Sequence, residues 1–290
     1  MGMIETDVLI VGGGPAGSAC AQRLKENDIE CLILDRQRFP RPKTCAGWIT
    51  PEALQAMHIT QTNYPHGLTR FTSFQISISH FQFTLPVHQY AIRRIEFDDW
   101  LLQQTGVPHE VHHVKKIEQR SGKYIIDDRY AGYFLVGAGG TTCPVRRTFF
   151  TQANPRDAGT LITAMEEEFI YEHVDDVCRL WFFENQLPGY AWYVPKSAGV
   201  INVGIGGNAA KLRARGSTIQ AHWDMLINKL EESGLACNHS YTPNGYSYYL
   251  RQKRAQVRIG NALIAGDAVG LATRDMGEGI RTAIESGQMA

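Results

Sequence analysis

A short glycine-rich segment near the start of the chain constrains its fold most strongly. The apolar run Val8–Val11 leads directly into three glycines spaced as G-x-G-x-x-G: Gly12, Gly14 and Gly17. Between a strand and a helix, such glycines allow a tight turn, a close backbone approach to a pyrophosphate and close helix–strand packing. We expect the helix to begin near Pro15 and Ala16 and to direct its N-terminal amides at the phosphates. The segment therefore predicts a dinucleotide site.

An acidic residue follows at a suitable distance. A second apolar run, 31–34, ends at Asp35, which lies 18 residues beyond Gly17. The carboxylate that accepts a hydrogen bond from a ribose hydroxyl usually follows the glycines by about 20 residues. We therefore expect Asp35 and the adjacent Arg36 to contact the cofactor.

A second strand-and-glycine segment lies near the other end of the chain. Ala262–Ala265 leads into Gly266 and Asp267, and the aspartate can accept hydrogen bonds from ribityl hydroxyls or act as a simple helix N-cap. Three further residues open the next helix, whose positive end could stabilise a reduced flavin: Gly277, Gly279 and Ile280. The pair of motifs predicts one long dinucleotide, FAD.

Composition narrows the class of protein. The 290 residues suffice for two substantial cores, and a formal net charge of zero gives no indication of a nucleic-acid partner. Six scattered cysteines without a C-x-x-C pair favour a reducing cytoplasm and argue against structural zinc. The histidines at 109, 112 and 113 lack a complementary ligand set, so we expect no metal. We expect neither a signal peptide nor a spanning helix, and the composition allows peripheral contact with a membrane surface.

The strand and helix patterns predict an α/β chain with a Rossmann-like FAD-binding domain and an inserted, mainly antiparallel β-sheet substrate domain. The FAD-binding domain is expected to be discontinuous, over 1–67, 92–150 and 245–290. The substrate domain is expected over 68–91 and 151–244. Within it, 217–232 reads as an amphipathic helix with Ser217 as its cap.

Further segments carry a family pattern over nearly the whole chain. They are a loop 39–47 ending in Lys-x-Cys-x-Gly, an Arg94-x-x-Phe-Asp segment, Gly-Ala-Gly-Gly at 137–140, and Tyr-x-Trp-x-Val-Pro at 190–195. With the two glycine motifs, they resemble the geranylgeranyl reductase family of FAD-dependent oxidoreductases, within the p-hydroxybenzoate hydroxylase superfamily. The resemblance implies the GR2 type of FAD-binding fold. Relatives continue with further helices, so the chain is expected to be truncated or naturally short.

The resemblance also implies cofactor contacts outside the glycine motifs. They are Lys43, Cys45, Ala46, Gly47, Arg94, Val114 and Gly139. Cys45 is the implied catalytic residue near flavin and substrate, and Lys43 could lower the pKa of its thiol. The alternatives are a small packing cysteine at 45 and a surface ion pair at Arg94.

The aromatic motif predicts a substrate wall. Tyr190 and Trp192 are two residues apart, so on a strand they face the same side. The resemblance makes them substrate residues together with Pro195. Four more aromatics could extend the wall: Phe81, Phe83, Trp181 and Phe183. The alternative is an ordinary sheet core.

These observations predict an enzyme that reduces carbon–carbon double bonds of a polyprenyl, geranylgeranyl-type or other apolar substrate by hydride transfer from reduced FAD. Residues 202–207 read as a strand with bulge-tolerant glycines rather than as an NADPH motif, so NADPH or a protein donor would bind transiently as reductant. One alternative is an aromatic monooxygenase or halogenase, from whose motifs Gly139 and Tyr190 depart. Another is a flavin electron-transfer module.

Overall fold

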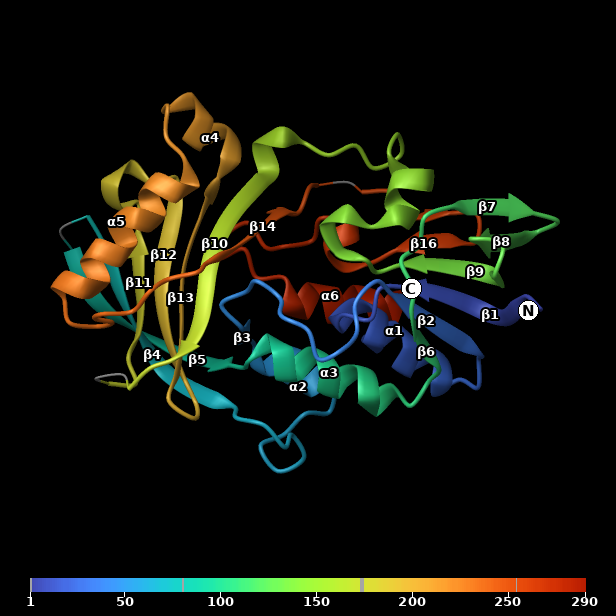
Figure 1. The fold of residues 1–290 in the computed structure, drawn as a ribbon, viewed down its shortest axis with the longest axis horizontal. Coiled ribbons are helices and arrows are strands. Elements are labelled where there is room, and N and C mark those ends of the chain that lie inside the picture. The colour runs from blue at the N-terminus through green and yellow to red at the C-terminus, as the bar shows by residue number, and fades with distance from the viewer. Residues whose placement is uncertain (1, 80, 173–174, 254) are drawn as a thin grey trace. The chain divides into compact units, whose positions relative to one another are not determined.

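Two β-sheets organise the chain, each in its own unit (Figure 1). The structure is a computed structural model and describes residues 2–79, 81–172, 175–253 and 255–290. Unit 1 comprises Met1–Arg41, Ile95–Arg156 and Tyr249–Ala290, and unit 2 comprises Pro42–Arg94 and Asp157–Tyr248.

The sheet of unit 1 is largely parallel. Its parallel strands follow the order β16 (Ala262–Ile264), β9 (Tyr130–Gly137), β1 (Ile4–Val11), β2 (Cys31–Asp35) and β6 (His109–Val111). Three short strands add antiparallel pairs at one side: β7 (Ile117–Arg120), β8 (Lys123–Ile126) and β15 (Arg258–Ile259). This is the Rossmann-like arrangement that the glycine motifs predicted.

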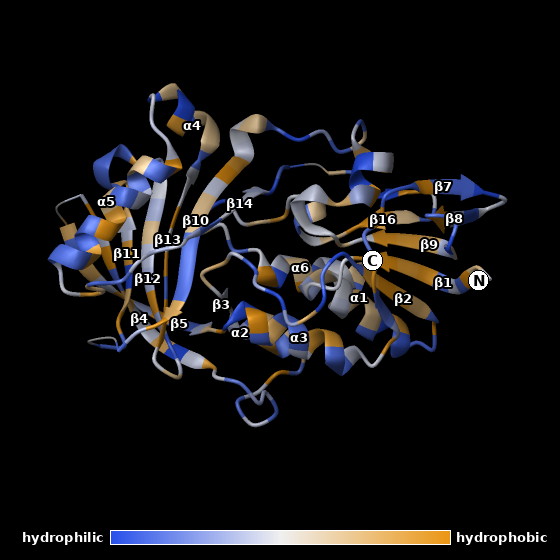
Figure 2. Cartoon of the chain, in the orientation of Figure 1, coloured by the Kyte–Doolittle hydropathy of each residue, from blue (hydrophilic) through white to orange (hydrophobic). Residues whose placement is uncertain are grey.

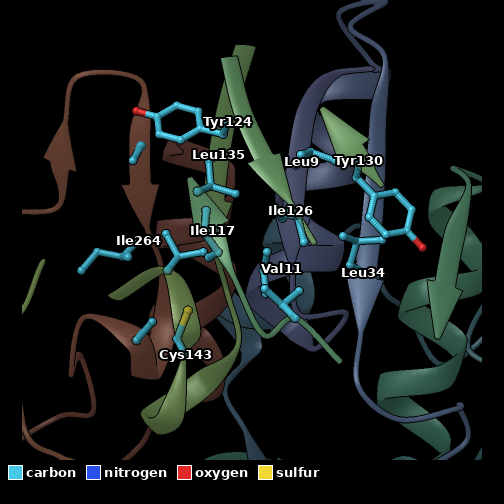
Figure 3. Close-up of a cluster of buried hydrophobic side chains, with 14 of the residues drawn as sticks. Leu9, Val11, Leu34, Ile117, Tyr124, Ile126, Tyr130, Leu135, Cys143 and Ile264 are labelled. Carbon is cyan, nitrogen blue, oxygen red and sulfur yellow. The ribbon is translucent and has the colours of Figure 1, made fainter. Parts of the chain in front are cut away.

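The central strands of unit 1 are buried on both faces, as continuous apolar runs require. Leu9 and Val11 of β1 point into a cluster with Leu34, Leu135 and side chains of the β7–β8 hairpin, which Figure 3 shows. The alternate residues of β1 pack on the opposite side against helix α1 (Pro15–Lys25). Figure 2 shows the resulting apolar colour along β1 and β9.

Gly287 lets two helices pack closely in unit 1. Helix α6 (Ile280–Met289) lies against α1, and a methyl group added at Gly287 would stand 2.1 Å from the carbonyl oxygen of Ala16. The two glycine motifs, at opposite ends of the sequence, thus place their helices side by side. The remaining helix, α3, spans Arg94–Thr105 and begins at the last residue of unit 2.

The second sheet is mainly antiparallel, as predicted. Its order is β14 (Asn244–Tyr249), β10 (Leu161–Ile170), β13 (Val200–Asn208), β12 (Gly189–Lys196), β11 (Cys178–Phe182), β4 (Thr69–Ile78), β5 (Phe81–Ala91) and β3 (Trp48–Ile49). The β4–β11 pair is parallel. The helices of this unit are α2 (Pro51–Ala56), α4 (Ala209–Ala214) and α5 (Ile219–Glu232).

Helix α5 covers one face of this sheet. Its Trp223, Leu226 and Leu230 pack against Tyr193 of β12 and Val203 of β13. The strand period of two then directs the neighbouring residues of these strands to the other face. That other face carries the polar and aromatic residues described below.

The structure differs from three sequence expectations. The cap of α5 is Thr218, whose hydroxyl accepts the Ala221 amide, while Ser217 contacts His222. The sequence from Val111 to Gln119 reads as one strand, but β6 ends at Val111 and β7 begins at Ile117. Residues 42–67, expected in the FAD-binding domain, group with unit 2, because β3 pairs with β5 and the backbone of Cys45 is bonded to β10.

Candidate functional site

The first glycine turn brings backbone against backbone. Gly12 has a φ of +113°, and a methyl group there would lie 2.4 Å from the carbonyl oxygen of Ala138. A methyl group at Gly17 would lie 1.8 Å from the oxygen of Gly12. Gly14 is the N-cap of α1 and, within the described residues, no side chain caps it. The turn therefore presents a helix start and bare backbone, as a phosphate site requires.

Arg41 lies beside this turn. A methyl group at Gly14 would stand 3.4 Å from its Nη2 atom. The guanidinium lies 4.5 Å from the centre of the Phe39 ring and 3.7 Å from the buried Asp98. An arginine held beside a helix start can bind a phosphate oxygen. Sequence reasoning missed this role, although Arg41 lies in the loop that carries the family pattern.

Asp35 lies at the carboxyl end of β2 and borders a cavity of about 510 Å³. Its carboxylate accepts the amides of Gly13 at 2.8 Å and Gln37 at 2.9 Å. A carboxylate has about four acceptor positions, so it can still accept a ribose hydroxyl. The cavity also has apolar walls, formed by Ile33, Phe39, Leu102 and Val111. It has the size and mixed lining of a nucleotide site.

The second glycine motif joins the first in unit 1. Gly266 has a φ of +61°, and a methyl group there would lie 3.1 Å from the Cβ of Ala16 and 3.4 Å from that of Ala283. Asp267 follows in a short turn, and its Oδ1 lies 3.6 Å from the Cβ position of Gly279. The aspartate and the start of α6 are thus neighbours.

The other cofactor candidates of unit 1 lie around these motifs. Gly139 follows β9, and its amide nitrogen is 2.7 Å from the Cβ position of Gly12. Arg36 directly follows β2, and Pro15 opens α1. The side chain of Val114 is buried in the same cluster as Leu9 and Val11. Gly277 has a φ of +67° before α6, which begins at Ile280.

The loop that carries Cys45 lies on the sheet of unit 2. The amide of Cys45 donates to Oε1 of Glu166 at 2.8 Å, and its carbonyl accepts from Nδ2 of Asn202 at 3.3 Å. Its Sγ accepts the Gly47 amide at 3.4 Å. Gly47 has a φ of +80°, and a methyl group there would meet the oxygen of Ile92 and Nζ of Lys196.

The remaining loop candidates are placed as follows. Nζ of Lys43 lies 2.9 Å from the centre of the Tyr246 ring, Ala46 is buried, and Arg94 is buried at the first turn of α3. These residues belong to unit 2.

Two glutamates of β10 face this loop in different environments. Glu166 is buried and also accepts Nδ2 of Asn202, whose Oδ1 accepts the indole N–H of Trp192 at 2.7 Å. Burial raises the pKa of Glu166 to about 7. Glu168 binds Lys196 at 2.6 Å and Arg93 at 2.9 Å. Burial alone would raise the pKa of Glu168. The two cations have the larger effect and hold this pKa below its usual range.

Sequence reasoning missed Glu166, Asn202 and Lys196. A usable signal was present in the run Glu166-Glu167-Glu168, because a strand places two of three consecutive acids on one face. Their pairing with Asn202 and with the Cys45 loop depends on sheet register, which the pattern does not contain.

The aromatic residues gathered around Tyr190 and Trp192 are not the set that the sequence predicted. The ring centres of Tyr190 and Trp192 are 5.8 Å apart, and both are near Trp48, at 6.2 and 6.3 Å. Phe182 adds a contact to Tyr190 at 5.0 Å, and Phe74 one to Trp48 at 5.8 Å. We call these five residues the aromatic face.

Several aromatics expected in this wall lie elsewhere. Trp181 packs with α5, because it is one residue before Phe182 and so faces the opposite side. Phe81 and Phe83 are 78% and 45% exposed on β5, and Phe183 follows β11 with a positive φ. By the same alternation, Pro195 does not share the face of Tyr190 and Trp192.

No group of three or more metal-ligating side chains occurs in the part of the chain that the structure describes. His112 instead binds Asp127 at 2.7 Å. Nor does any helix of the described residues have the length and apolarity needed to cross a bilayer.

Comparisons with known proteins agree with this geometry. Residues 5–62 match the FAD binding domain family. Digeranylgeranylglycerophospholipid reductase 3 of Methanosphaera stadtmanae is 26% identical over 100% of this chain and 77% of that protein. Menaquinone reductase of Mycobacterium tuberculosis is 25% identical over 99% of this chain and 76% of that protein. The chain is similar to these reductases over nearly its whole length. It is an FAD-dependent oxidoreductase.

Solved structures share the fold of this chain. A geranylgeranyl bacteriochlorophyll reductase-like protein from Thermoplasma acidophilum superposes with a TM-score of 0.86 at 20% identity, covering 99% of this chain and 77% of that one. The flavin-dependent halogenase CmlS superposes with a TM-score of 0.74 at 18% identity, covering 99% and 57%. The fold is therefore shared by reductases and halogenases, and the chemistry has to be argued from the residues.

Proposed function

We propose that this protein reduces carbon–carbon double bonds of a polyprenyl chain or a similarly apolar substrate. The observation that carries the proposal is the placement of Cys45. Its loop is bonded to Glu166 and Asn202, and Asn202 in turn holds Trp192 of the aromatic face. The matching cysteine of the resembling family is the implied catalytic residue. Trp48, Phe182 and Tyr190 of the aromatic face are only partly buried, and such rings suit an apolar substrate.

The proposed cofactor site lies within unit 1 and uses the two glycine motifs. The turn 12–17 and Arg41 would hold the pyrophosphate, and Asp35 with its adjoining cavity would hold the adenosine part. Asp267 would accept ribityl hydroxyls, and the start of α6 would favour negative charge on the reduced ring. The close backbone approaches at Gly12 and Gly17 support this assignment.

Reduced FAD supplies a hydride when bound. Saturation of a double bond also needs one proton at the neighbouring carbon, so the substrate gains two electrons and two hydrogens. Cys45 would hold that proton on its Sγ atom or position a water that does, and the aromatic face would orient the chain. NADPH or a protein electron donor would then restore the reduced cofactor.

The test is an anaerobic flavin assay. The protein is loaded with FAD, reduced chemically without oxygen, and mixed with a geranylgeranyl lipid or with its fully saturated counterpart. We expect the yellow flavin band to return with the unsaturated lipid only. Formation of a hydroxylated or halogenated aromatic product when oxygen is admitted, without flavin reoxidation by lipid, would assign a monooxygenase or halogenase instead. Cycling with a protein donor alone would assign an electron-transfer module.

A further inference from the structure

Both polar backbone atoms of Cys45 are held by side chains of the sheet. Glu166 accepts its amide from β10, and Asn202 donates to its carbonyl from β13. The orientation of the Asn202 amide is set by Trp192, whose indole N–H requires Oδ1 as acceptor. Nδ2 of Asn202 therefore faces both Glu166 and the carbonyl of Cys45.

The carboxyl of Glu166 consequently faces two N–H donors, one at each oxygen. The ionised form accepts both. A protonated carboxyl places a hydrogen on one oxygen, which weakens its acceptance of the N–H that it faces. The geometry thus couples the protonation of Glu166 to the hydrogen bond that holds Cys45.

The charges around Glu166 come from three segments. Lys196 of β12 lowers its pKa, and Glu168 of β10 raises it, while Arg93 before α3 is bound to Glu168. Lys196 forms its ion pair with Glu168, so burial dominates at Glu166. Its ionisation therefore falls close to neutral pH, where the hydrogen-bonding change can occur under ordinary conditions.

We propose that Glu166 is the positioning residue of Cys45, and that ionisation of its carboxyl tightens the Lys43–Gly47 loop on the sheet while protonation loosens it. The inference rests on the proposed function in taking Cys45 as the functional thiol. The attachment of the loop itself requires neither flavin nor substrate. It can therefore be measured separately.

The test uses the reactivity of Cys45. Cys45 and Cys237 are partly exposed and the other four cysteines are buried, so a Cys237→Ser background reports on Cys45. The rate of reaction with an aromatic disulfide reagent is measured as a function of pH. The thiolate is the form that reacts. If the exposure of the loop does not change with pH, the rate rises tenfold per pH unit below the thiol pKa.

In the Cys237→Ser protein we expect a break near pH 7. Above the break the rate per thiolate is about fivefold lower, the change that one hydrogen bond produces. Adding Glu166→Gln removes the break. Adding Glu168→Gln keeps it but moves it to lower pH, because a neighbouring negative charge that raises the pKa of Glu166 is lost. Identical unbroken profiles with and without Glu166→Gln overturn the proposal.

A second measurement needs no substitution. Amide hydrogen exchange of Cys45, relative to its intrinsic rate, should lose protection as the pH falls through about 7. Protection that does not change with pH overturns the proposal, even where Glu166→Gln prevents folding. A break in thiol reactivity without flavin reoxidation by lipid would retain this inference and reject the proposed function.

Discussion

Glu166 and Glu168 lie two residues apart on the same strand, yet only Glu168 is bound by Lys196 and Arg93. The Glu166 carboxyl receives the Cys45 amide and the Asn202 amide instead. The same face therefore carries one carboxyl that ionises easily and one that resists ionisation. Neighbouring acids with separated pKa values are a usual arrangement where protons are handled.

The raised pKa of Glu166 should make the stability of the protein depend on pH. Its folded-state pKa of about 7 lies above the ordinary 4.5, so its favourable contribution is complete below 4.5 and is lost as the pH rises through 7. Glu166→Gln removes this dependence. Urea unfolding measures the free energy of unfolding of both proteins. The value for the variant minus the value for the native protein should rise by about 2–3 kcal/mol between pH 5 and pH 8. Parallel stability curves would contradict the raised pKa.

Substitution of the buried Lys196 should cause a large loss of stability. It is 3% exposed and bound to Glu168, so Lys196→Met leaves a carboxylate with a weakened set of partners. Breaking a buried ion pair on one side costs about 3–5 kcal/mol. Equilibrium unfolding measures this, and Lys123→Met, which removes a surface ion pair with Glu5, is the control with a much smaller expected loss. A loss of stability in Lys196→Met as small as that in Lys123→Met would show that Lys196 is not structurally required.

A single methyl group added at Gly17 should weaken cofactor binding. In Gly17→Ala the Cβ would lie 1.8 Å from the oxygen of Gly12, so α1 has to move from the turn. We expect FAD affinity to fall at least about tenfold because the helix start is displaced. Gly13→Ala is the matched control in the same motif, since its Cβ meets the Phe39 ring at an ordinary 3.4 Å. Fluorescence titration with FAD separates the two, and retained affinity in Gly17→Ala would refute the assignment.

The Trp192 ring packs directly against the backbone of Gly204, so a larger residue at 204 should be destabilising. A methyl group there would lie 2.2 Å from Cζ2 of Trp192, whereas one at Gly206 would lie 3.7 Å from Cζ3. Gly204→Ala should cost about 1–3 kcal/mol through overpacking, and Gly206→Ala much less. Thermal unfolding followed by tryptophan fluorescence tests the pair. Comparable losses at the two positions would place Trp192 differently.

Cys45 predicts a specific loss of activity. Cys45→Ala keeps the backbone bonds to Glu166 and Asn202, so the fold and bound FAD should be retained. If the thiol handles the proton, reduction of the lipid slows by about 10²–10⁴-fold, the usual contribution of a positioned acid. Stopped-flow reoxidation of reduced flavin measures it, with Cys237→Ala as the control. Unchanged reoxidation in Cys45→Ala would restrict this residue to packing.

The sequence by itself determined the two-part α/β architecture and the FAD chemistry of the first unit. Gly12 and Gly17 carry backbone requirements that only glycine meets, and apolar runs such as Val8–Val11 show burial directly. Strand alternation likewise predicted that Tyr190 and Trp192 share a face. These features depend on neighbours within a few residues, so a pattern is enough to find them.

Tertiary structure alone decided which distant residues meet. Glu166 reaches Cys45 across 121 positions, and Trp48 joins the aromatic face in place of Trp181. Both outcomes follow from sheet order and register, because a shift of one residue turns a side chain to the opposite face. Burial then sets the pKa of Glu166, which depends on solvent exclusion by several segments together. Such properties belong to the packed fold and have no local sequence pattern.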